Sequence, residues 1–79
     1  KEVTRQETYR VLYEAIDKLP AQSRAVILLN LKGNNNTEVA AELRVSVNTV
    51  KSLKKSAYVK LRELLSKDIL MILFILLEK

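Results

Sequence analysis

Apolar residues recur near the start of the chain at the three- and four-residue steps of a helix. This spacing predicts an amphipathic helix over about residues 4–18. We expect one apolar stripe to face the core, formed by Tyr9, Leu12, Tyr13, Ile16 and Leu19.

A second helix is predicted over about residues 20–32. Pro20 suits its first turn, where a backbone N–H would have no helical partner anyway. Residues 25–29 are all apolar, and this arc is too wide for a helix that faces water on most sides. We therefore expect the second helix to lie at the centre of the fold. Gly33 and three asparagines end it, and Asn36 is expected to cap the helix that follows.

Two more helices follow, a short one over about 37–43 and a longer one over about 46–66. The short helix points Val39, Ala40 and Leu43 inward, and Ser46 is expected to cap the longer helix. The longer helix has an apolar side formed by Val47, Val50, Ala57, Leu61, Leu64 and Leu65. Its opposite side is formed by Asn48, Lys51, Ser52, Lys55, Ser56 and Arg62, with Val59 as an apolar exception.

A short helix, a brief turn and a longer capped helix form the helix-turn-helix pattern, in which the second helix enters the DNA major groove. Ala40 is small where the two helices cross, Val45 fills the turn, and Val50 packs the second helix on the first. No strand pattern is present. We therefore predict an all-α fold: a four-helix DNA-binding domain without a wing, over residues 1–67, with a helical extension over 68–79.

Charge is distributed unevenly along the chain, whose net charge is +5. Residues 1–43 are neutral, whereas residues 44–67 hold seven Lys or Arg and one Glu. A basic segment of this kind indicates a polyanionic partner, because each phosphate contact releases condensed counterions. A lysine-rich face that only maintains solubility is the alternative.

The predicted DNA surface lies on the fourth helix. Asn48, Lys51 and Ser52 are expected to face base edges, and the helix N-terminus at Ser46 is expected to face a phosphate. Lys54, Lys55, Lys60 and Arg62 are expected to contact phosphates. The full predicted set is Ser46, Val47, Asn48, Thr49, Lys51, Ser52, Lys54, Lys55, Lys60 and Arg62.

Residues 19–65 resemble region 4, the C-terminal domain of bacterial extracytoplasmic-function sigma factors. The resemblance rests on Leu-Pro and an Arg at Leu19, Pro20 and Arg24, on Glu38-Val39-Ala40, on Ser46-Val47-Asn48-Thr49-Val50-Lys51, and on Leu61-Arg62. It implies a domain that reads the promoter −35 element of double-stranded DNA and docks on the flap of RNA polymerase, in the cytoplasm. An anti-sigma factor is a further implied partner. The lysine-rich fourth helix and aliphatic C-terminus are similar to the Bacteroidetes branch.

One residue departs from the family pattern at the helix-turn-helix turn. Arg44 stands where the family usually has Gly. Either Arg44 adopts a costly left-handed backbone or the turn is built differently.

The C-terminal segment 69–77 is apolar without interruption. As a helix it would measure about 14 Å, roughly half the hydrocarbon core of a bilayer, so no membrane span is predicted. A helix that is apolar on every side must be covered. We expect the cover to be the first two helices or the same segment of a second copy, giving a homodimer. Another part of a parent protein, an anti-sigma factor or a membrane surface are the alternatives.

An enzyme and a bound cofactor are not expected, because the chain has no His, no Cys and no glycine-rich phosphate loop. Glu38 and Glu42 are spaced like a metal pair, but a solvated pair is the simpler interpretation. Two other functions stay open. One is a LuxR-like response-regulator domain, which also binds DNA. The other is a protein-interaction module for RNA polymerase or an anti-sigma factor.

Overall fold

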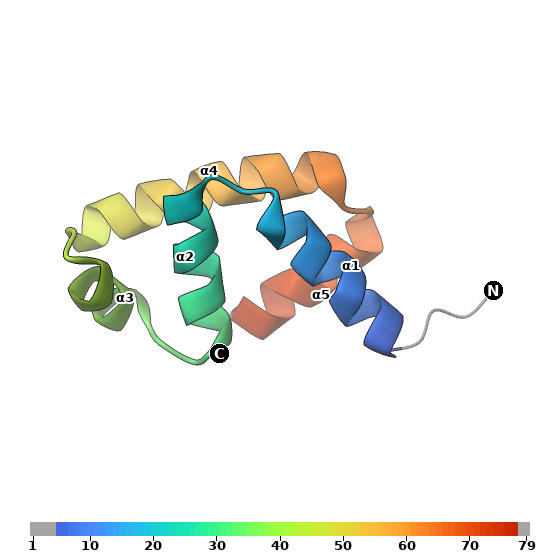
Figure 1. The fold of residues 1–79 in the computed structure, drawn as a ribbon, viewed down its shortest axis with the longest axis horizontal. Helices are drawn as coiled ribbons and strands as arrows, with labels where there is room; N and C mark the ends of the chain where they lie inside the picture. Colours follow the sequence, from blue (N-terminus) through green and yellow to red (C-terminus); the bar gives the residue numbers. More distant parts are fainter. Residues whose placement is uncertain (1–4, 78–79) are drawn as a thin grey trace.

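Five helices form the part of the chain that the structure describes, residues 5–77 of a computed structural model (Figure 1). They are α1 (Arg5–Asp17), α2 (Ala21–Leu31), α3 (Asn36–Leu43), α4 (Val47–Leu64) and α5 (Lys67–Leu77). Within the described residues there is no strand, and the predicted all-α fold with a helical C-terminal extension is confirmed. The expected helix start at residue 4 and the tail residues 78–79 lie outside the described residues.

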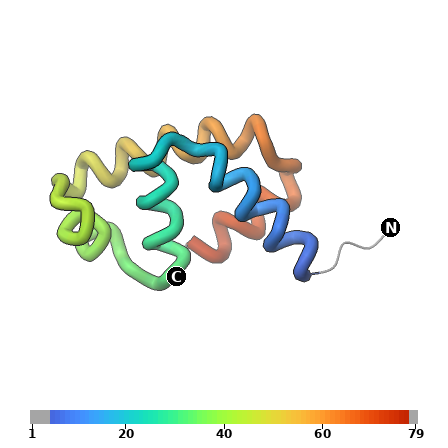
Figure 2. Tube along the Cα trace, in the orientation of Figure 1, coloured from blue at the N-terminus to red at the C-terminus, as the bar shows by residue number. Residues whose placement is uncertain are grey.

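The second helix occupies the centre, as its wide apolar arc predicted. α2 contacts each of the other four helices. The longest helix, α4, runs along the length of the molecule, with α3 beside its first turns and α1 and α5 towards its other end (Figure 2). The helix α3 and the first turns of α4 therefore occupy one end of the fold.

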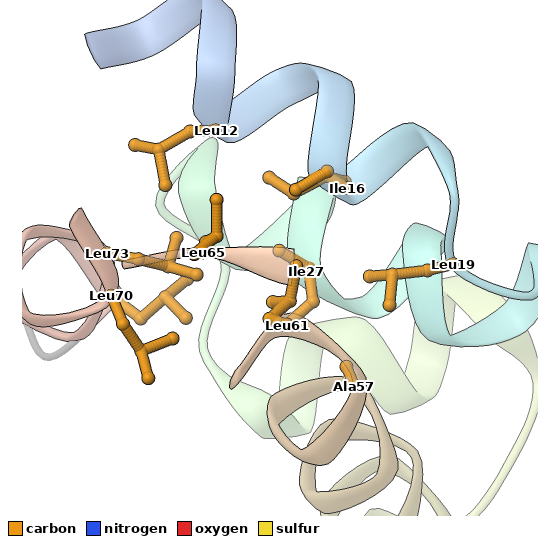
Figure 3. Close-up of a cluster of buried hydrophobic side chains, with 11 residues drawn as sticks. Leu12, Ile16, Leu19, Ile27, Ala57, Leu61, Leu65, Leu70 and Leu73 are labelled. Carbon is orange, nitrogen blue, oxygen red and sulfur yellow. The ribbon is translucent and has the colours of Figure 1, made fainter. Parts of the chain in front are cut away.

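Two groups of buried apolar side chains hold the helices together. The first joins α1, α2, α4 and α5 and is drawn in Figure 3, which labels most of its members. It contains Leu12, Ala15, Ile16, Leu19, Ile27, Ala57, Leu61, Leu65, Leu70, Leu73 and Leu77. The second joins α2, α3 and α4 and contains only Val26, Val39, Ala40 and Val50. Burial of each large side chain contributes about 1.5–3 kcal/mol. The end of the fold that holds α3 and the first turns of α4 thus has fewer fully buried side chains than the opposite end has.

The inward face of α1 differs from the prediction in its aromatic residues. Leu12 and Ile16 are buried, but Tyr9 and Tyr13 keep 40% and 50% of their surface exposed. The actual core stripe runs through Leu12, Ala15 and Ile16. Tyr9 and Tyr13 lie one helical turn apart beside this stripe, so their spacing alone could not separate them from it.

The connection between α2 and α3 is held by asparagine side chains. The cap of α3 is Asn35, so the prediction of Asn36 was wrong by one residue. Asn35 Oδ1 accepts from the Glu38 N–H at 2.8 Å, and Glu38 Oε1 accepts from the Asn35 N–H at 2.8 Å, which is a capping box. Asn36 becomes the first residue of the helix.

The C-terminal helix α5 packs on its own domain through one face. Leu70, Leu73 and Leu77 are buried against the first core group, at the i, i+3, i+7 spacing of one helical stripe. The ring of Phe74 meets Tyr58 edge to face, with centroids 5.0 Å apart. The opposite face, formed by Met71, Ile72 and Ile75, stays exposed.

Candidate nucleic-acid interface

The turn between α3 and α4 uses a left-handed residue. Arg44 has φ 59° and ψ 45°, the only positive φ of a non-glycine residue among residues 5–77. Of the two alternatives from the sequence, the costly left-handed backbone is therefore the one observed. The Arg44 side chain is exposed beside the start of α4.

Ser46 caps α4 as predicted. Its Oγ accepts from the Thr49 N–H at 3.0 Å and lies 2.9 Å from Thr49 Oγ1. The cap occupies one of the free N–H groups of the first turn, and the remaining N–H groups face outward with the positive end of the helix dipole. The hydroxyl groups of Ser46 and Thr49 therefore take part in the start of α4 and are also exposed on the surface.

Five of the predicted residues form one exposed face of α4. At 100° per residue they fall within an arc of roughly 100°, turned away from the buried Val50, Ala57 and Leu61. The arc contains Asn48, Lys51, Ser52, Lys55 and Arg62, all exposed. Val59 lies in the same arc and is 51% exposed, so the apolar exception noted in the sequence is real. We call these six residues the recognition face.

Other predicted residues lie elsewhere on the helix. Val47 is half-buried and packs against the second core group. Lys60 lies on the flank of α4 opposite Val47, and its ammonium pairs with the Glu63 carboxylate at 3.8 Å. Lys54 is half-buried and points to α3, where its Nζ lies 3.4 Å from Asn36 Oδ1. The ten predicted residues thus do not form a single surface.

The cations of the recognition face are available to an external anion. Within residues 5–77, three ion pairs occur: Arg10–Glu14, Asp17–Arg24 and Lys60–Glu63. Lys51, Lys55 and Arg62 take part in none of them. Since their charges have no carboxylate partner in the described part of the chain, contact with a phosphate breaks no existing ion pair.

A comparison with protein families matches residues 9–61 to the family described as Sigma-70, region 4. The match covers 53 of the 79 residues and includes α2, α3 and most of α4. The chain belongs to the sigma-70 region 4 family. No curated protein and no solved structure matched the chain.

Region 4 domains bind the promoter −35 element in transcription initiation, with RNA polymerase as partner, and they are not enzymes. The match supports sigma function over the response-regulator alternative. It ends at Leu61, so the last turn of α4 and all of α5 lie outside the matched part of region 4. The match includes all of α3, the turn and α4 as far as Leu61.

A second surface of this region 4 domain was not found from the sequence. A cavity of about 360 Å³ opens between α1 and α2, lined by Arg10, Tyr13, Glu14, Ile16, Asp17, Arg24 and Leu28. Arg24 Nη1 donates to the carbonyl oxygen of Asp17 at 3.1 Å. The signal available in the sequence was Tyr13, which was assigned to the core because of its helical spacing.

The apolar segment 69–77 was predicted to be too short to span a membrane. Among the described residues, no helix combines the length and the apolar character that crossing a bilayer requires.

Proposed function

We propose that this region 4 domain reads the −35 element through the recognition face of α4. Asn48, Lys51 and Ser52 lie on the first turns, nearest the N-terminal end that helix-turn-helix proteins insert into the major groove. Their amide, ammonium and hydroxyl groups suit base edges. Lys55 and Arg62 contact phosphates on the same side. The single observation that carries this proposal is the exposure of these five polar residues in one arc.

The remaining predicted residues have supporting roles in the proposal. Ser46 and Thr49 present the start of α4 to a phosphate, and Lys60 contacts the backbone of the other strand from the opposite flank. Val47 holds the first turn of α4 on the core beside the groove. Lys54 has a different role, which is argued below.

Selection of random duplexes by the protein at low salt tests sequence reading. An enriched motif is expected, and its absence would contradict specific recognition by this domain alone. The face itself is tested with Lys51→Ala and Lys55→Ala, each of which should weaken binding to the enriched duplex. Lys55→Ala should also reduce the slope of log K against log salt by about 1, whereas Lys51→Ala should relax the preference for the enriched motif. Lys18→Ala, an exposed lysine outside α4, is the control.

The flap of RNA polymerase is proposed to dock on the cavity between α1 and α2. Tyr13 and Arg24 line it beside Leu28, and exposed tyrosine and arginine beside apolar surface are typical of protein interfaces. Tyr13→Ala should weaken binding to the polymerase flap at least tenfold, whereas the exposed Gln22→Ala should not. Equal binding by both variants would move the docking site elsewhere. An anti-sigma factor that competes with the flap is proposed for the same cavity.

Self-association is proposed for the outer face of α5, where Met71 and Ile75 are 56% and 70% exposed. Light scattering over a concentration series should then show dimers, and Ile75→Glu should abolish them. A protein that stays monomeric at every concentration would contradict the dimer.

Residues 1–67 are proposed to act as the DNA-binding unit, with residues 68–79 as an apolar, helical C-terminal tail. The proposal places the protein in the cytoplasm, beside RNA polymerase, and in the Bacteroidetes-like branch of extracytoplasmic-function sigma factors. Localisation of a fluorescent fusion with the nucleoid is expected.

A further inference from the structure

Lys54 differs from its neighbours on α4 in what its ammonium group touches. Lys51 and Lys55 are exposed, whereas Lys54 is half-buried. It follows the buried Val50 by one helical turn, so the helix turns its stem towards the core edge. Its Nζ lies 3.4 Å from Asn36 Oδ1, on the first residue of α3.

Lys54 contacts the start of α3, and hydrogen bonds of asparagine side chains hold this part of the backbone. Asn30 Nδ2 donates to the carbonyl oxygen of Asn34 at 2.8 Å, and Asn34 Nδ2 donates to the carbonyl oxygen of Leu29 at 3.1 Å. The capping box at Asn35 then fixes the start of α3. The side chain of Asn36 therefore projects from backbone with little freedom to move.

The surroundings of this contact suit a cation. A cavity of about 200 Å³ is lined by Asn30, Gly33, Asn34, Asn35, Asn36, Lys54 and Leu77. Asn30 is 6% exposed, and its Oδ1 has no hydrogen-bond partner in the described part of the chain. A buried carbonyl oxygen without a partner is unfavourable, and a nearby ammonium group reduces that cost. Among the described residues that line the cavity there is no carboxylate, and the Lys54 ammonium contacts the amide oxygen of Asn36.

The contact joins α3 and α4 at a second place. The turn at Arg44 connects the last residue of α3 to the start of α4, and the Lys54–Asn36 contact connects the first residue of α3 to α4 about two turns further on. Between the two places, α3 and α4 pack through the second core group, whose four buried members are surrounded by partly buried apolar side chains. The turn and the Lys54–Asn36 contact thus connect both ends of α3 to α4.

We propose that Lys54 is a positioning residue for promoter recognition, which sets the angle of α4 through Asn36 and does not neutralise a DNA phosphate. The proposal rests on DNA binding through α4. Because geometry affects base contacts more than charge contacts, loss of Lys54 lowers sequence discrimination and leaves counterion release unchanged.

The test compares Lys54→Met, which keeps the stem and removes the charge, with Lys55→Ala. Binding is titrated over a salt series with the duplex enriched from the random library and with a scrambled duplex. For Lys54→Met we expect roughly two- to tenfold weaker binding to the enriched duplex, unchanged binding to the scrambled one, and an unchanged salt slope. Lys54→Arg should restore discrimination. Circular dichroism verifies that each variant is folded at the titration temperature.

Three outcomes with Lys54→Met would overturn the proposal. A salt slope reduced by about 1 would make Lys54 a phosphate contact. Equal loss of binding to both duplexes, or no loss to either, would leave it without a positioning role. If Lys55→Ala left the slope unchanged, the recognition face would be wrong instead, so the two failures are distinct.

A double-mutant cycle in thermal unfolding tests the contact without DNA. Lys54→Met, Asn36→Ala and the double variant should be non-additive, because either single change removes the same contact. Additive effects on unfolding would contradict the contact and, with it, the proposal.

Discussion

The backbone N–H of Val45 donates to the carbonyl oxygen of Ala40 at 3.0 Å and closes the turn of the helix-turn-helix. A second bond, from the Arg44 N–H to the carbonyl oxygen of Ala41, completes a Schellman motif. α2 ends in the same way, with the Asn34 N–H donating to the carbonyl oxygen of Leu29 at 3.1 Å. The left-handed position is Gly33 in one motif and Arg44 in the other.

Arg44→Gly should therefore stabilise the domain. A left-handed backbone costs an L-residue about 1–2 kcal/mol, and glycine avoids this cost while it adds freedom to the unfolded chain. The net gain we expect is about 0.5–1 kcal/mol in the free energy of unfolding, measured by urea denaturation. A loss of stability would indicate that the exposed arginine makes a favourable contribution that outweighs its strain.

Gly33→Ala should have the opposite effect. Gly33 has φ 108°, and a Cβ added there would meet no atom within 4 Å, so the cost comes from the backbone alone. We expect a loss of about 1–2 kcal/mol in the free energy of unfolding. Gly33→Asn should lose less, because asparagine tolerates positive φ better than alanine. Equal stability of the alanine variant and the unchanged protein would contradict this account.

The pattern of apolar residues predicted all five helices, through stripes or wide apolar arcs in the first four and through an unbroken apolar run in the fifth. It could not choose between adjacent positions. Asn35 and Asn36 are equivalent in type, and only the reach of Glu38 to the Asn35 N–H selects the cap. Leu64 was expected inside and is 37% exposed, whereas the neighbouring Leu65 is buried. The helix ends between them, so the wheel no longer applies at that point.

For the candidate site, the sequence predicted which residues of α4 are exposed, but it could not predict contacts between helices. Residue type placed Asn48, Lys51 and Lys55 on the outer side of α4, where they are exposed. The same reasoning grouped Lys54 with them, because a lysine beside other lysines carries no sign of its partner. The contact with Asn36, eighteen positions earlier in the chain, depends on how α3 crosses α4. Such a contact appears only when the helices are packed.

The cap of α4 should contribute measurably to stability. Ser46 Oγ accepts from the Thr49 N–H, and loss of such a cap typically costs about 1 kcal/mol. Ser46→Ala should lower the free energy of unfolding by this amount. Ser52→Ala, on an exposed position inside the same helix, should change it by less than about 0.5 kcal/mol. Similar results for both serines would mean that the first turn of α4 does not depend on its cap.

The final prediction concerns α5, which lies outside the matched part of region 4 yet supplies three members of the first core group. Leu73 is fully buried, so Leu73→Ala removes apolar contacts and leaves a cavity, and should cost about 2–5 kcal/mol in the free energy of unfolding. Ile75, two residues away on the same helix, is 70% exposed, and Ile75→Ala should cost less than about 0.5 kcal/mol at concentrations where the protein is monomeric. Urea denaturation of both variants measures the difference. If Leu73→Ala were as stable as Ile75→Ala, α5 would not be part of the folded core, and residues 9–61 would be expected to fold without it.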